Sequence, residues 1–354
     1  MRPPLISLHF CIVCIRTFRN SLRVSLRNSF PFRAWQLRFP RVRRPGADSE
    51  RRGLNAPNAG FDRVRARPLG EGVSPGSPLQ RSARNISENV ALCARALTRP
   101  TRSAGLPQSS GIIVVSLALV AAAAVSMPVL DGSAVEWARG EPHWFRAAFE
   151  EITRFGLSGW FLFPCGFLLL FLAVVTSPQL PGSARAVFAA LGARFGYVFL
   201  AIALPGLFVS IVKRLIGRAR PFVGGHEDPF HYAPFNWHPA FASMPSGHAT
   251  TVVAAAIAIG AIWPRTRLVM WIYAAAIMIS RVAVLAHHPS DVIAGALVAL
   301  VGTHLLRRWF AARGLVFRAS DLGAKPAPSL GRVTAALRQA MSPRPGHPSA
   351  SSPN

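Results

Sequence analysis

The sequence predicts an all-α protein, a polytopic bundle of about six helices that cross a membrane. Two observations predict this fold class. Hydrophobic residues make up 51% of the 354 residues and charged residues only 15%, a balance that favours a membrane protein. From Gly111 onward, uncharged apolar segments follow one another with short polar connections between them.

The first three apolar segments are the clearest. Gly111–Leu130 contains no charged residue, and about 20 apolar residues in a helix cross a hydrocarbon core about 30 Å thick. Leu157–Val175 has the same character, and so does Phe195–Val212, which ends at Lys213. Each is expected to be a membrane-spanning helix.

Three later segments are shorter: Ala249–Trp263, Val269–Leu285 and Val292–Leu306. Alone, each would fit a helix buried in a soluble core equally well. Their place in one series with tight connections favours six spans instead.

The two ends of the chain have a different composition. Residues 1–105 are rich in Arg, Pro, Ser, Asn and Gly and have no sustained period, so we expect a disordered leader. Its apolar run Leu5–Ile15 is compatible with a signal-peptide core, and the whole leader with a start assigned too far upstream. We expect a catalytic membrane domain over 106–312 and a disordered, basic, cytoplasmic tail over 313–354.

The charge distribution predicts the orientation. The net charge is +26, and residues 1–110 alone hold 20 Arg against 5 acidic residues. Such an excess fits nucleic acid or an anionic membrane, and its place beside apolar spans favours membrane lipids, so no nucleic-acid partner is expected. The loop 131–155 is instead mixed in charge. The positive-inside rule then places both ends in the cytoplasm, with 144–155 lying along the outer surface. We expect the inner membrane of a bacterium.

Ionisable residues are costly at membrane depth and tend to mark function. Here they gather at three span ends. Lys213 and Arg220 are seven residues apart, about two helical turns, and Pro221 disfavours helix at Arg220. Snorkelling side chains at an interface are the alternative interpretation.

The second stretch is Pro245–Ser246–Gly247–His248, directly before an apolar helix. Free N–H groups at a helix N-terminus suit phosphate oxygens, although a plain serine cap gives the same pattern.

The third stretch runs from Ser280 to Asp291. Arg281 within an apolar span needs an anionic partner. His287 and Asp291 are four residues apart, so on a helix the carboxylate can meet the imidazole. A carboxylate that fixes the tautomer leaves the other ring nitrogen free to attack. A histidine satisfied within the core is the alternative.

Together the three stretches resemble the signature motifs of the type 2 phosphatidic acid phosphatases (PAP2), a superfamily that also contains the vanadium haloperoxidases. The family pattern is K-x6-R-P, then P-S-G-H, then S-R-x5-H-x3-D. Every fixed position is filled here, by Lys213, Arg220, Pro221, Pro245, Ser246, Gly247, His248, Ser280, Arg281, His287 and Asp291. Membrane members usually have tyrosine after the third-motif histidine, where this chain has His288.

The resemblance implies a PAP2-like fold and a role for each motif residue. His287 would be the nucleophile that forms a phosphohistidine, Asp291 would orient it, and His248 would act as general acid and then general base. The phosphate would be bound by Lys213, Arg220, Ser246, Gly247 and Arg281. Arg214 and Arg218 would help bind anionic head groups, and the aromatic residues of 222–243 would line a route for the lipid.

No metal and no cofactor is expected. Cys11 and Cys14 lack the second pair that would complete a zinc set, and no carboxylate cluster suited to Mg²⁺ lies near the motifs.

The implied substrate is a lipid phosphate or diphosphate, with phosphatidic acid, phosphatidylglycerol phosphate, polyprenyl diphosphate and lipid A as candidates. A lipid phosphotransferase would use the same motifs with an acceptor in place of water. A vanadium haloperoxidase is disfavoured by the spans, and an inactive lipid-binding or transport protein by the intact histidines.

Overall fold

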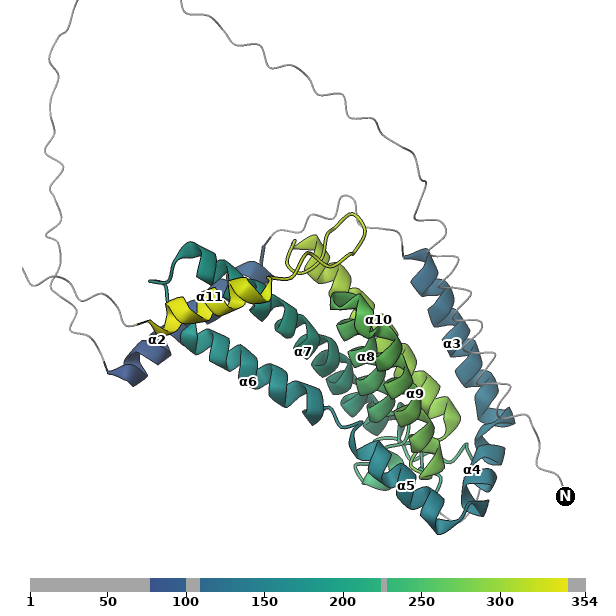
Figure 1. The fold of residues 1–354 in the computed structure, drawn as a ribbon. Coiled ribbons are helices and arrows are strands. Elements are labelled where there is room, and N and C mark those ends of the chain that lie inside the picture. The colour runs from purple at the N-terminus through teal and green to yellow at the C-terminus, as the bar shows by residue number, and fades with distance from the viewer. Residues whose placement is uncertain (1–76, 100–108, 224–227, 343–354) are drawn as a thin grey trace, which may run out of the picture. The chain divides into compact units, whose positions relative to one another are not determined.

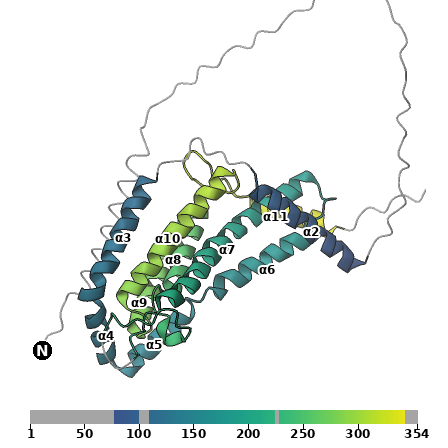
Figure 2. The same ribbon diagram turned by 180° about the vertical axis from the view of Figure 1, so that it is seen from behind.

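The structure is a computed structural model that describes residues 77–99, 109–223 and 228–342. Within these ranges the regular secondary structure is helical, apart from two isolated bridges. Figures 1 and 2 show the helices from two sides. The α-helices are α2 (Pro78–Leu97), α3 (Ser110–Val129), α4 (Asp131–Gly140), α5 (His143–Arg154), α6 (Gly159–Val175), α7 (Gly182–Ile216), α8 (Gly247–Ile262), α9 (Arg267–Ala283), α10 (Pro289–Ala312) and α11 (Leu330–Met341).

The expected membrane bundle is confirmed, with a helix count close to six. Five helical stretches of the described chain are long and apolar enough to cross a membrane, namely α3, the α5–α6 stretch, α7, α9 with the short turn before it, and α10. Their outward side chains, such as Leu117, Phe167, Leu207 and Ile272, are exposed and suited to contact with lipid.

The sixth apolar helix, α8, has only 16 residues, and 12 of them are buried. It packs against α7, α9 and α10, and its many alanines let the neighbouring backbones approach closely. Its 16 residues are fewer than a helix usually needs to cross a membrane, which is why the sequence alone made this span a weak prediction.

The end of α7 sets the position of the following arginines. Helix α7 ends at Gly217, which has φ +64°, the left-handed conformation that glycine adopts without penalty. A Cβ atom here would lie 1.8 Å from the carbonyl oxygen of Ala233, whose N–H donates to the Gly217 carbonyl at 2.7 Å. The chain therefore turns sharply at Gly217, so that Arg218 and Arg220 leave the helix axis.

Part of the leader and part of the tail, which we expected to be disordered, are helical in the residues that the structure describes. Helix α2 packs against α6, where the Asn89 amide donates to the carbonyls of Ala173 and Thr176 at 2.9 and 2.7 Å. Helix α11 packs against α7, and Arg194 of α7 donates to the carbonyl of Lys325 at 2.8 Å. Residues 1–76, which include Leu5–Ile15 and the two leader cysteines, lie outside the described residues.

Candidate active site

The three motif stretches meet at one end of the bundle. They occupy the end of α7 with the loop after it, the start of α8, and the connection from α9 to α10. The described side chains of Lys213, Arg220, Arg281 and His287 all lie close enough to His248 to act on its charge. Segments separated by up to about 70 residues of sequence thus form one cluster of four cationic or potentially cationic groups around one histidine.

Two arginines of this cluster have buried donor atoms that no group of the described residues satisfies. The Nε atoms of Arg220 and Arg281 are buried without a hydrogen-bond partner in the described part of the chain. Burial lowers the pKa of Arg220. Arg281 donates from Nη1 to the Thr153 hydroxyl of α5 at 2.7 Å, a neutral partner that leaves its charge uncompensated. A bound anion would supply the missing charge.

The start of α8 provides further donors. The Ser246 hydroxyl caps the helix by accepting from the N–H of Ala249 at 3.5 Å, and the first intrahelical bond is donated by Thr250. The N–H groups of Gly247 and His248 precede that bond and point out of the helix. A Cβ atom on Gly247 would meet nothing within 4 Å, so a ligand can approach the backbone at this point. The Ser246 side chain itself is fully buried as a cap.

His287 lies between the two spans α9 and α10 and is 4% exposed. Its Nδ1 atom lies 3.8 Å from Oδ2 of Asp291, which is longer than a hydrogen bond. Burial lowers the pKa of His287 to about 4, against the opposing effect of the Asp291 carboxylate. At neutral pH the imidazole is therefore uncharged, the state in which a ring nitrogen can act as a nucleophile.

His248 is packed against the junction between α5 and α6. A Cβ atom built on Gly156 would lie 2.7 Å from Cδ2 of His248 and 2.6 Å from Cγ2 of Ile277. The backbone at Gly156 therefore forms one wall of the histidine's site. Neither Gly156 nor Thr153 belongs to a motif, and no pattern in the sequence singles them out.

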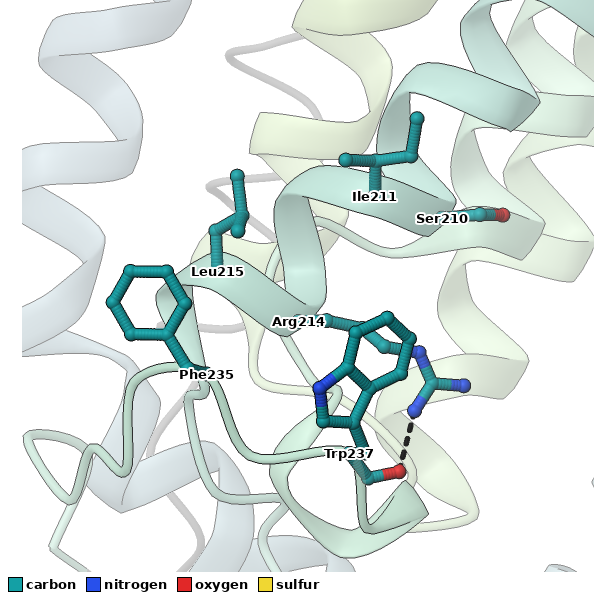
Figure 3. A pocket seen from close by; sticks show the side chains of 6 residues that line it. All are labelled: Ser210, Ile211, Arg214, Leu215, Phe235 and Trp237. Atoms are coloured by element: carbon teal, nitrogen blue, oxygen red, sulfur yellow. Dashed lines mark hydrogen bonds between the residues drawn. The ribbon is translucent and has the colours of Figure 1, made fainter.

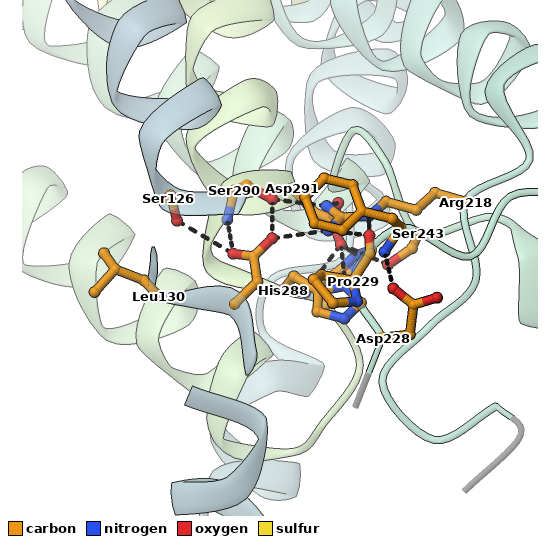
Figure 4. Close-up of polar contacts among 12 residues, drawn as sticks. Ser126, Leu130, Arg218, Asp228, Pro229, Ser243, His288, Ser290 and Asp291 are labelled. Atoms are coloured by element: carbon orange, nitrogen blue, oxygen red, sulfur yellow. Dashed lines mark hydrogen bonds and ion pairs between the residues drawn. The ribbon is translucent and has the colours of Figure 1, made fainter. Parts of the chain in front are cut away.

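Arg218 has a role that the sequence did not predict. We expected this residue to help bind head groups, but its side chain is 0% exposed. It donates from Nη1 to Oδ1 of Asp291 at 2.6 Å and from Nη2 to Oδ2 of Asp131 at 2.8 Å. Both carboxylates are also 0% exposed. Figure 4 shows Arg218 in this group of polar contacts together with Asp291, Ser290, Ser243 and Ser126.

Arg214 instead lies at an exposed apolar groove of about 150 Å³ beside the end of α7. Its guanidinium stands over the Trp237 ring at 5.2 Å and donates to the Trp237 carbonyl at 2.5 Å. Ile211, Leu215 and Phe235 complete the wall (Figure 3). The last turns of α7 therefore carry residues of the groove and, at Lys213, a residue of the cationic cluster.

The chain is similar to several known proteins. The family model of the PAP2 superfamily matches residues 194–315. A lipid A 1-phosphatase of Rhizobium johnstonii is 38% identical over 49% of this chain and 71% of its own length. That of Rhizobium etli is 37% identical over 49% of this chain and 74% of its own length. A solved structure of a transmembrane PAP2-type phosphatidylglycerolphosphate phosphatase from Bacillus subtilis aligns at 20% identity and a TM-score of 0.39, over 55% of this chain and 92% of that one.

Proposed function

This chain is an integral-membrane phosphatase of the PAP2 superfamily, and we propose that it removes a phosphate from a lipid through a phosphohistidine on His287. The observation that carries the proposal is the meeting of His287 and His248 with three cations at one end of the bundle, of which Arg281 is buried and Lys213 and Arg220 are half-buried. Phosphoryl transfer depends on positioning and on stabilising charge at the equatorial oxygens, and this cluster offers both.

In the first step, the neutral His287 imidazole attacks phosphorus and the bond from phosphorus to the leaving oxygen breaks. His248 gives its proton to that oxygen. In the second step, His248 takes a proton from water, which attacks the phosphohistidine and releases inorganic phosphate. Lys213, Arg220 and Arg281 hold the phosphoryl oxygens throughout, with the N–H of Gly247. The Ser246 side chain supports this site indirectly, by capping α8.

We propose the 1-phosphate of lipid A as the substrate. Two curated relatives that this chain matches over more than two thirds of their length are named lipid A 1-phosphatases. The apolar groove beside Arg214 and Trp237 also suits a substrate whose acyl chains stay in the membrane, because an aromatic ring and an arginine favour the headgroup level. The positive-inside asymmetry supports an active site on the outer, periplasmic face.

The experiment is phosphate release by the purified protein from a panel of lipid A, phosphatidic acid, phosphatidylglycerol phosphate and polyprenyl diphosphate. We expect the highest kcat/KM on lipid A, with loss of the 1-phosphate. A higher value on another lipid would overturn the substrate assignment while leaving the phosphatase intact. A phosphorylated acceptor in place of free phosphate would identify a phosphotransferase, and no turnover on any lipid would favour a binding or transport role.

The nucleophile is tested separately by rapid quench. Acid-labile, base-stable phosphate should appear on the wild-type protein and be absent from His287→Ala, whose turnover should fall to background. His304→Ala is the matched control, because His304 lies on α10 near Ser109, at the opposite end of that helix from Asp291. Retained turnover in His287→Ala would show that another residue is the nucleophile.

A further inference from the structure

The contacts of Arg218 form a closed network. Apart from Asp291, its members are not fixed positions of the signature motifs. Asp131, at the start of α4, accepts from Arg218 at 2.8 Å, from the Ser290 N–H at 3.0 Å and from the Ser126 hydroxyl at 3.2 Å. The Ser290 hydroxyl accepts from Arg218 at 2.6 Å and donates to Asp131 at 2.5 Å. The network therefore ties α3, α4 and the loop after α7 to the residue directly before Asp291.

The same network occupies the Asp291 carboxylate. Oδ1 accepts from Arg218, and Oδ2 accepts from the Ser243 hydroxyl at 2.5 Å and from the His288 N–H at 2.9 Å. Oδ2 is also the atom 3.8 Å from His287 Nδ1. Arg218 and Ser243 therefore fix the carboxylate that faces the histidine, and Arg218 is in turn fixed by Asp131.

The charges in the network bear on His287 as well. With both carboxylates ionised and Arg218 protonated, the group retains one negative charge. In the described part of the chain, Arg220 from the loop and Arg281 from α9 act on the charge of His287, and Lys213 from α7 acts on that of the neighbouring His248. His288 lies beside the same Asp291 carboxylate. The residual negative charge is thus what opposes the surrounding cations when His287 becomes cationic during phosphoryl transfer.

We propose that Asp131 and Arg218 are positioning residues for this phosphatase, which hold Asp291 in place and preserve the negative charge that it presents to His287. The inference rests on the proposed roles of His287 and Asp291. A purely structural clamp would fix the ends of the same helices, but it would not depend on the charge of Asp131.

The test is a double-mutant cycle on kcat with Asp131→Asn and Asp291→Asn. We expect Asp131→Asn to lower kcat about tenfold or more, with KM and vanadate inhibition changed less than threefold, because the phosphate-binding cations are untouched. The double variant should be no slower than Asp291→Asn alone, since groups that act through one another are not additive. Glu151→Gln is the matched control, an acidic residue of α5 whose side chain is 64% exposed in a surface ion pair.

The pH profile separates positioning from structural support. Removing the negative charge of Asp131 disfavours the protonated form of His287, so the acid limb of kcat should move to lower pH in Asp131→Asn and stay in place in Glu151→Gln. If the acid limb of kcat does not move in Asp131→Asn, or if the losses in kcat multiply in the double variant, then Asp131 has a structural role only. Full activity of Asp291→Asn would instead defeat the proposed mechanism itself.

A milder substitution decides the matter if Asp131→Asn fails to insert. Ser290→Ala removes only the hydroxyl that bridges Arg218 and Asp131. We expect Ser290→Ala to lower kcat several-fold in the wild-type background. In the Asp291→Asn background the same substitution should cause no further loss. Wild-type kcat in Ser290→Ala would overturn the proposal.

Discussion

At the scale of single residues, the protonation state of His287 is the property on which the proposed chemistry depends. Its pKa is lowered to about 4 by burial, whereas an exposed histidine titrates near 6.5. The imidazole is therefore neutral throughout pH 5–8. The neutral form gives way to the protonated form only as the pH falls toward 4.

We predict that NMR titration of histidine-labelled protein without substrate will show His287 still neutral at pH 5.5, where an ordinary histidine is mostly protonated. The spectrum of His287→Gln assigns the signal. A midpoint at pH 6 or above in the folded, ligand-free protein would contradict this account of the burial.

Gly156 allows a second prediction, because its missing side chain makes room for the His248 ring. Gly156→Ala places a Cβ atom 2.7 Å from that ring, so the histidine must shift. A misplacement of about 1 Å can lower a rate ~10²-fold, and we expect kcat to fall ~10- to 100-fold while phosphohistidine still forms. Gly192→Ala on α7 meets nothing within 4 Å and should keep the wild-type rate. Equal kcat values in both variants would mean that the structure around Gly156 accommodates the added methyl group without displacing His248.

At the scale of elements, the sequence predicted the spans and motif residues but not their supports. Apolar runs and fixed spacings are local patterns, so α3, α6, α7 and the three stretches could be read directly. Asp131 could not, because the first charged residue after an apolar run looks like an interfacial residue, and its burial depends on Arg218, 87 positions later. Arg218 was misjudged for the same reason: its charge is satisfied by carboxylates on two other elements.

Helix α2 shows why composition alone misled us about the leader. Its apolar residues Leu79, Ile86, Val90 and Leu97 recur at helical spacing within a stretch that is otherwise mostly polar or small, and two asparagines anchor it. Asn85 donates to the Val174 carbonyl at 2.9 Å, and Asn89 reaches two more carbonyls at the end of α6. These are the C-terminal carbonyls that a helix cannot satisfy internally.

We therefore predict that replacing both Asn85 and Asn89 with alanine lowers the thermal midpoint of the purified protein by a few degrees, since each lost hydrogen bond is worth about 1 kcal/mol. The specific activity below the transition should be unchanged, because α2 lies at the opposite end of α6 from His248. Arg81→Ala, an exposed position on the same helix, is the control. A midpoint unchanged from wild type would mean that these contacts do not hold α2 against α6.

At the scale of the whole molecule, the helix ends divide the described charges into two groups. One end of the bundle carries the site together with the acidic residues of α4 and α5. The other carries the arginines of α2, of the first turn of α7, of the α8–α9 connection, of the end of α10 and of α11. From the positive-inside rule we propose that the second group lies in the cytoplasm and the active site outside, within reach of a lipid of the outer leaflet.

Two single cysteines test this orientation directly. Cys93 is an exposed native cysteine on α2, and it serves once Cys11, Cys14 and Cys165 are replaced by alanine. Asn236→Cys, made in a background without Cys93, reports the loop beside Trp237. In intact cells with a permeable outer membrane, a membrane-impermeant maleimide should label position 236 and leave Cys93 unlabelled. Lysed cells should label both, which shows that each thiol is reactive. Labelling of Cys93 but not of position 236 in intact cells would invert the topology and place phosphate release in the cytoplasm.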